Sequence, residues 1–171
     1  PDVRRVGDPG EGTDAPQDPL RTTARVEVVF GERVGFEGFG LRGRLAGRLE
    51  VRDAPGRLPT GRGELRVEDG VYQAYGQDLT IARGRFVYAD TPLDNPDLDV
   101  VAQREAGEVT AGVEVSGGLR DRKLTLFSEP EMPQSQALSY LVLGRHLGQA
   151  SAGEGRRLQS AAVFLAAGAG N

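Results

Sequence analysis

The chain contains no cysteine and only one histidine, His146. The lack of cysteine excludes disulfide bonds, thiolate zinc sites and cysteine nucleophiles. A single histidine excludes any metal site that needs several imidazole ligands. We therefore expect no metal site and no cofactor in this chain.

A surplus of positive charge and a long apolar run are lacking as well. The 171 residues carry a net charge of −4 at pH 7, whereas a surface that binds nucleic acid needs a basic surplus. The apolar run near the C-terminus, "AAVFLAAGAG" (161–170), is too short for a membrane span of about 20 residues. We expect neither a nucleic-acid partner nor a membrane span in this chain.

Motifs for catalysis are weak or missing. The stretch "GFGLRG" (38–43) matches the dinucleotide-binding pattern G-x-G-x-x-G, but that pattern needs a helix N-terminus after it, and a strand pattern follows instead. Asp94, Asp97 and Asp99 lack the spacing of an EF-hand, and the nucleophile motif G-x-S-x-G does not occur. We predict that the chain is not an enzyme and has no catalytic residues.

Residues 1–20 carry four prolines and no aromatic residue. They cannot bury enough apolar area to offset the entropy of ordering, so we expect a flexible linker there. We expect a β-domain over 21–128 and a C-terminal helical segment over 129–171.

Most of the chain between Thr22 and Phe127 alternates apolar and polar residues with the period of two that β-strands show. In "GLRGRLAGRLEVRD" (40–53) the leucines fall on one face and the arginines on the other. The outer row consists of Arg42, Arg44, Arg48 and Arg52, which we interpret as a solvated face. We expect turns at Asp69–Gly70, Asn95–Pro96 and Gly117–Gly118. Seven or eight strands without helices between them predict a mainly antiparallel, all-β unit.

After Pro133 the pattern changes to a helical one. In "QSQALSYLVLGRHL" (134–147) Ser135 is the expected N-cap and Gly144 the expected stop, with His146 near the helix end. "EGRRLQSAAVFLAAGAGN" (154–171) predicts a second helix. The apolar stripe of this second helix is expected at Leu158, Ala161, Ala162 and Leu165.

Three segments resemble the C-terminal region of the TamB family in both order and spacing. They are "GVYQAYGQDLTIARGRFVY" (70–88), "LDNPDLDVVAQRE" (93–105) and "LFSEPEMPQSQALSYLVLGR" (126–145). The resemblance extends from about Ala24 to about Leu165. It implies a periplasmic chain whose full-length protein is anchored in the inner membrane outside this fragment and reaches the outer membrane. The family is similar to AsmA-like, bridge-forming lipid-transfer proteins, which implies a curled antiparallel sheet with a taco- or U-shaped hydrophobic groove and one or two short C-terminal helices.

The resemblance also implies a function and partners. The groove would shield phospholipid acyl chains between the two membranes, and the C-terminal end would dock to a TamA-like outer-membrane barrel protein and support outer-membrane protein assembly. On this basis Leu138, Tyr140, Leu141 and Leu143 are candidates for partner docking. The candidate groove lining consists of Val26, Val28, Phe30, Leu41, Leu45, Leu49, Leu65, Val67, Leu79, Ile81, Phe86, Leu98, Val100, Val113, Val115, Leu124 and Leu126.

The residues alone leave alternatives open. An alternating apolar face also suits the closed core of a sandwich, which would make the domain a structural spacer. Exposed strand edges could instead pair with an outer-membrane barrel or with unfolded outer-membrane proteins, in a protein-binding or chaperone role. The C-terminal helices could pack on the sheet rather than dock to a partner.

Overall fold

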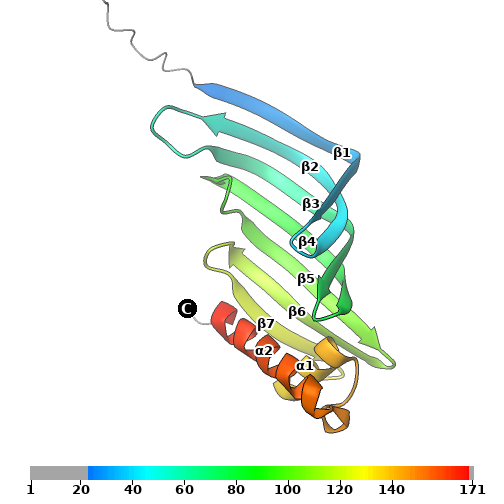
Figure 1. Cartoon of the computed structure of the whole chain (residues 1–171). Coiled ribbons are helices and arrows are strands. Elements are labelled where there is room, and N and C mark those ends of the chain that lie inside the picture. Colours follow the sequence, from blue (N-terminus) through cyan, green and yellow to red (C-terminus); the bar gives the residue numbers. More distant parts are fainter. Residues whose placement is uncertain (1–22, 170–171) are drawn as a thin grey trace, which may run out of the picture.

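The computed structural model describes residues 23–169, which form one open antiparallel sheet with helices packed against it (Figure 1). The strands are β1 (Ala24–Gly38), β2 (Leu41–Asp53), β3 (Thr60–Ala74), β4 (Gln77–Pro92), β5 (Asp97–Ala106), β6 (Val109–Gly118) and β7 (Lys123–Glu129). They pair in sequence order, and β1 and β7 are the two ends of the sheet. Figure 1 shows the sheet curling between these ends.

The predicted mainly-β class with a curled antiparallel sheet is therefore confirmed, and the closed-sandwich alternative is wrong. The linker expected over 1–20 lies outside the described residues.

The register of the strands places the alternating apolar residues on one face. Leu45 pairs with Val67 across β2 and β3, and Phe86 on β4 pairs with Leu65 on one side and Leu98 on the other. Directly paired residues of an antiparallel sheet project to the same side. The apolar residues that pair in this way across all seven strands therefore form one surface, which we call the apolar face.

Irregularities inside the strands shift this alternation. Asp69 has a φ of 49° within β3, so Asp69–Gly70 is a bulge and not the predicted turn. Before the bulge Val67 projects to the apolar face, and after it Tyr72 does so, opposite Leu79. A one-residue insertion moves the following side chains to the other face, which explains the change of phase.

Two glycines bend the middle of the sheet between β2 and β3. Gly47 and Gly63 have φ values of 133° and 138°, a region that is open essentially to glycine alone. A Cβ at Gly47 would lie 2.2 Å from the carbonyl oxygen of Glu64, and a Cβ at Gly63 would lie 2.1 Å from that of Arg48. Glycine at both positions allows the backbones to approach and the strands to bend.

The helices are α1 (Gln134–Leu143), the short 3-10 helix η1 (Leu147–Gln149) and α2 (Ala152–Ala169). Helix α1 is capped by Pro133 without a side-chain hydrogen bond, so the predicted N-cap at Ser135 is wrong. Gly144 ends α1 with a φ of 72°, as predicted. His146 precedes η1, where its Nδ1 accepts a hydrogen bond from the backbone N–H of Gly148 at 3.1 Å.

Helices α1 and α2 cover one end of the apolar face. Leu141 of α1 packs with Leu79, Ala102 and Ala111 of the sheet. The two helices meet each other through Leu138, Val142, Leu158 and Ala161, with Leu126 of β7 beside them. Of the stripe predicted for α2, Ala162 is exposed, because the buried side of the helix runs through Leu158, Ala161 and Leu165.

Arg104 ties α1 to the sheet electrostatically. A Cβ at Gly144 would lie 2.5 Å from its Nη2, so the guanidinium lies against the C-terminal cap of α1. Helix α1 has no basic residue in its own last turn. A cation at this end is favourable, because the helix dipole leaves partial negative charge on the last carbonyl groups.

Candidate functional site: the apolar face of the sheet

All the lining residues expected from the sequence belong to the apolar face, but they differ in burial. Two residues of β1 are exposed, Val26 at 52% and Val28 at 36%. The leucines Leu49, Leu65, Leu79, Leu98 and Leu124 are buried. The other ten are half-buried: Phe30, Leu41, Leu45, Val67, Ile81, Phe86, Val100, Val113, Val115 and Leu126. Exposure is therefore greatest at the β1 end of the face.

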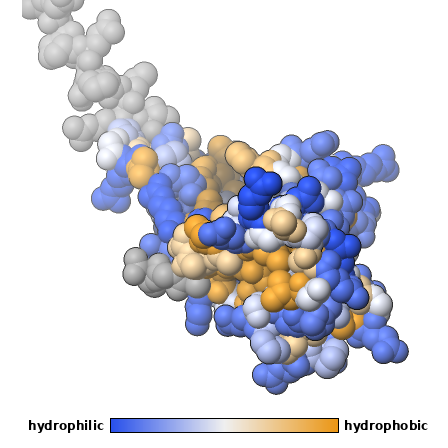
Figure 2. Space-filling model, turned by 60° about the horizontal axis from the view of Figure 1, so that its bottom comes forward, coloured by the Kyte–Doolittle hydropathy of each residue, from blue (hydrophilic) through white to orange (hydrophobic). Residues whose placement is uncertain are grey.

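The helices divide this face into a covered and an open part. Helix α1 contacts β5, β6 and β7, and α2 contacts β7. On the side toward β1, Leu79 of β4 packs under Leu141 of α1, and Tyr72 of β3 and Ile81 of β4 lie at the edge of this contact. Figure 2 shows apolar side chains gathered in the middle of the molecule and bordered by hydrophilic ones. Over β1, β2 and most of β3 and β4 the described helices leave the apolar face open, which is the geometry of a site for an apolar ligand.

The structure adds residues to this face that the sequence prediction omitted. Val34 and Phe36 of β1 pair with Leu45 and Gly43. Tyr88 of β4 pairs with Gly63. Val34 and Phe36 continue the alternation beyond Phe30, so that signal could have found them. Tyr88 likewise continues the alternation from Phe86 and could have been found, whereas Tyr72 follows a register shift, so a constant alternation from Val67 assigns it to the wrong side.

The candidate docking residues of α1 lie inside the molecule. Leu138 and Leu141 are buried, and Tyr140 and Leu143 pack against the two clusters below the helix. Ser139, also on α1, is fully buried and donates a hydrogen bond from Oγ to the carbonyl of Arg145 at 2.7 Å. In this arrangement the four residues pack α1 onto the sheet and onto α2. Partner docking by these residues remains a prediction and would require α1 to leave the sheet.

The opposite face of the sheet carries paired charges. Arg48 of β2 pairs with Glu27 of β1 at 2.9 Å, and Arg44 pairs with Asp69. Arg83 of β4 pairs with Asp99 of β5 at 2.7 Å. These exposed pairs contribute little stability individually, but they make this face unsuitable for apolar ligands.

Glu64 is the most strongly perturbed group of this charged face. Its carboxylate accepts hydrogen bonds from Arg85 at 2.8 Å and from Arg66 at 2.7 Å. These two arginines lower the pKa of Glu64 from 4.5 to about 2. The carboxylate is thus ionised over the whole physiological pH range and serves as a fixed anion between two cations.

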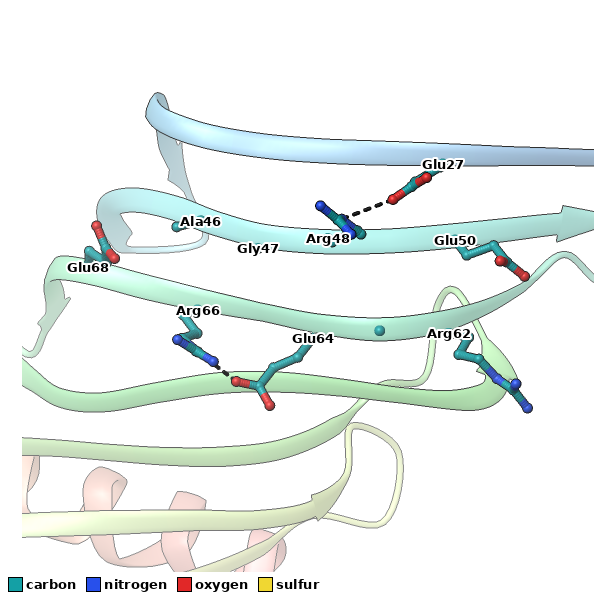
Figure 3. Close-up of a pocket in the computed structure, with 10 residues that line it drawn as sticks. Glu27, Ala46, Gly47, Arg48, Glu50, Arg62, Glu64, Arg66 and Glu68 are labelled. Carbon is teal, nitrogen blue, oxygen red and sulfur yellow. Dashed lines mark hydrogen bonds and ion pairs between the residues drawn. The ribbon is translucent and has the colours of Figure 1, made fainter.

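A hollow of about 530 Å³ lies on this charged face over β1, β2 and β3 (Figure 3). Gly47 and Gly63 belong to its wall, so it lies where the strands bend. Its other lining residues are Ala46 and seven charged side chains: Glu27, Arg48, Glu50, Arg62, Glu64, Arg66 and Glu68. Figure 3 shows Arg48 directed at Glu27 and Arg66 at Glu64. Its four acidic and three basic side chains are each paired with an opposite charge in the hollow or beside it, so the hollow offers neither a strong net charge nor an apolar wall to a ligand.

Two of the aspartates singled out in the sequence, Asp94 and Asp99, pair with arginines. Over residues 23–169 no three His, Cys, Asp or Glu side chains gather into a set that could hold a metal ion. Asp94 pairs with Arg120, and Asp99 pairs with Arg83 and Arg85. Among the described helices, none is both long and apolar enough to cross a membrane.

Comparison with known proteins agrees with the resemblance seen in the sequence. The family model of the TamB C-terminal domain matches residues 3–171. Translocation and assembly module subunit TamB of Haemophilus influenzae is 36% identical over 133 residues, which are 75% of this chain and 10% of that protein. The chain thus spans about a tenth of the length of this relative. The family match and this identity, together with an open, curled sheet that is apolar on one face, show that the chain belongs to the TamB C-terminal domain family.

Proposed function

We propose that this domain is a non-enzymatic, periplasmic segment of a lipid-transfer conduit that shields phospholipid acyl chains between the inner and outer membranes. The observation that carries the proposal is the apolar face, which continues across all seven strands and is left open by the described helices over β1, β2 and most of β3 and β4. The relative's name, a subunit of a translocation and assembly module, is compatible with such a role.

The physical basis is burial of hydrocarbon without chemistry. Each methylene group of an acyl chain that leaves water for the apolar face gains about 0.8 kcal/mol. The face is lined by leucine, valine and phenylalanine, with few polar groups to fix a ligand in one place. Contacts of this kind favour sliding of a chain along the face over tight binding at one position. The headgroup would stay in water at the open margin of the sheet.

A pair of neighbouring substitutions tests this proposal. Leu45→Arg places a charge on the apolar face, whereas Ala46→Arg places the same charge on the opposite face of the same strand, where Ala46 pairs with Arg66. We expect Leu45→Arg to lower extraction of a phospholipid with a fluorescent acyl chain from vesicles by about tenfold, because a buried charge costs more than a single lost apolar contact. Ala46→Arg should extract lipid like the wild type. Equal extraction by folded Leu45→Arg would refute the proposal.

A second function is favoured by the free edge of β1. In the part of the chain that the structure describes, this strand pairs on one side with β2 and ends the sheet on the other, so the backbone groups of its outer side could accept a strand of an outer-membrane barrel partner or of an unfolded outer-membrane protein. Val29→Lys with Gly35→Lys places lysines on this edge, where Val29 is 61% exposed and a side chain at Gly35 meets no atom. Loss of barrel binding with lipid extraction intact would show that the edge, and not the apolar face, carries the interaction.

A further inference from the structure

The two margins of the curled sheet differ in their connections. Short turns at 39–40, 75–76 and 107–108 join β1 to β2, β3 to β4 and β5 to β6. Because consecutive strands run antiparallel, these three turns lie on one margin, which we call the turn rim. The longer connections at 54–59, 93–96 and 119–122 lie on the other margin, which we call the loop rim.

Two turns of the turn rim carry aromatic residues in a backbone conformation that disfavours them. Phe39 and Tyr75 both have a φ of 53°, and the glycines that follow them have φ values of 80° and 76°. Positive φ at both central residues defines the tight hairpin turn for which Asn, Asp and Gly are preferred. A bulky side chain in this conformation is an outlier that needs a reason.

Packing within the chain does not supply that reason. The side chain of Phe39 is 97% exposed and that of Tyr75 is 38% exposed. Of the six phenylalanines and four tyrosines in the chain, two of each lie within three residues of these turns, namely Phe36, Phe39, Tyr72 and Tyr75. The exposed large apolar side chains of the loop rim are instead leucines, Leu58 at 65% and Leu119 at 41%. Aromatic rings are thus concentrated on one margin of the open part of the apolar face.

The apolar face ends at this margin. The last pairs before the turns are Gly38 with Leu41 and Ala74 with Gln77, and beyond them lies water. Phenylalanine and tyrosine rings favour the zone where hydrocarbon meets water and polar headgroups. Leu141 of α1 packs over Leu79, close to the turn at 75–76. The turn at 39–40 therefore borders the open part of the face, and the turn at 75–76 lies where the cover by α1 begins.

We propose that the turn rim at Phe39 and Tyr75 holds the headgroup–tail junction of a bound phospholipid, so that lipids lie across the sheet in one orientation. The inference rests on the proposed function and adds an orientation to it. The acyl chains lie on the apolar face with their ends toward the loop rim. The two rings contact the glycerol ester region, and the headgroup projects past the turns into water.

Site-specific photo-crosslinking tests the orientation. A benzophenone-bearing phenylalanine analogue is placed at Phe39 or Tyr75 on the turn rim, at Leu58 or Leu119 on the loop rim, and at Leu45 on the apolar face. Each protein is irradiated with vesicles of phosphatidylethanolamine and phosphatidylglycerol, the acyl esters are hydrolysed, and the modified peptide is weighed by mass spectrometry. A crosslink to the headgroup side leaves glycerophosphate on the peptide, whereas a crosslink to the tail leaves a fatty acid.

We expect glycerophosphate adducts at Phe39 and Tyr75 and fatty-acid adducts at Leu45, Leu58 and Leu119. Glycerophosphate adducts that are equally frequent on both rims, or more frequent on the loop rim, would overturn the orientation while the conduit stands. Crosslinking of lipid to Leu45 alone would likewise overturn the orientation and leave the conduit in place. If none of the five positions is crosslinked to lipid, the conduit itself fails and the orientation falls with it.

A matched set of variants tests the two rings directly. Phe39→Asn with Tyr75→Asn installs residues that the turns prefer, so the melting temperature should stay the same or rise. Lipid extraction should fall about threefold, the loss expected for two interfacial aromatic contacts. The control, Val163→Ser with Phe164→Ser, removes an exposed aliphatic and an exposed aromatic residue from α2, away from both rims, and should extract lipid like the wild type. Equal losses in the two variants, or no loss in the first, would contradict the proposal.

Discussion

At the scale of single residues, the curvature of the sheet depends on Gly47 and Gly63. Both glycines have φ values near 135° and leave no room for a Cβ against the neighbouring carbonyl oxygens. A sheet needs such positions to curl, because regular pleated strands give a flatter surface. The composition already indicates this, since 25 of 171 residues are glycine, but only the register shows which of them bend the strands.

Replacement of Gly47 by alanine should therefore destabilise the fold. The new Cβ would overlap the carbonyl oxygen of Glu64, 2.2 Å away, and the backbone conformation is strained for any L-residue. We expect Gly47→Ala to lower the free energy of unfolding by about 2–4 kcal/mol, measured by urea denaturation. Gly35→Ala is the control, because a Cβ there meets no atom within 4 Å. A Gly47→Ala protein as stable as Gly35→Ala would show that the bend is not needed.

The charged face should contribute stability that depends on pH through Glu64. Hydrogen bonds from Arg85 and Arg66 hold the pKa of Glu64 at about 2, below its ordinary value of 4.5. A carboxylate with a lowered folded-state pKa stabilises the fold above its ordinary pKa, and this contribution is lost as the pH falls toward the folded-state pKa. The pH window of the loss therefore lies between about 4.5 and about 2.

The difference in melting temperature between the wild type and Glu64→Gln should be largest at neutral pH and vanish near pH 2. Titration of the Glu64 carboxyl carbon by NMR measures the pKa directly. Arg85→Gln should raise this pKa, because the hydrogen bond from Arg85 lowers it more than the bond from Arg66 does. A difference in melting temperature that does not change between pH 7 and pH 2 would contradict the assignment.

At the scale of elements, the docking of α1 on the sheet can be tested by a cavity. Leu141 is 6% exposed and packs with Leu79, Ala102 and Ala111, so Leu141→Ala should cost about 2–5 kcal/mol. Val163→Ala on α2 is the control, since Val163 is 63% exposed and its loss should change stability by less than about 0.5 kcal/mol. Chemical denaturation measures both. An unaffected Leu141→Ala protein would mean that α1 does not rest on the sheet in solution, which would favour its role in partner docking.

Much of the element order could be predicted from the sequence, because the strands alternate over most of their length and the bulges interrupt the pattern only locally. The helical change after Pro133 and the stop at Gly144 were equally visible. Asp69–Gly70 was misread as a turn, because aspartate followed by glycine favours a positive φ both in a turn and in a bulge. The hairpin turns at Phe39–Gly40 and Tyr75–Gly76 were missed, because their aromatic residues are not those that such turns prefer.

At the scale of the whole molecule, the sequence could not tell an open sheet from a closed core. Alternation reports that one face of a strand avoids water, but not what covers that face. The partial cover by α1 and α2 depends on long-range packing of Leu138, Leu141 and Leu158, which leaves no local signature. The candidate lining residues share a face because the register pairs them with one another across neighbouring strands. Their binding of lipid remains a proposal.

The measurement that tests the central claim most directly is native mass spectrometry of the purified domain, followed by extraction and identification of any lipid that remains bound. The account predicts phospholipid on the wild type and on Ala46→Arg, and its loss from a folded Leu45→Arg protein. Lipid-free wild-type protein, or lipid retained equally by Leu45→Arg, would contradict a conduit on the apolar face and leave the free edge of β1 as the functional surface.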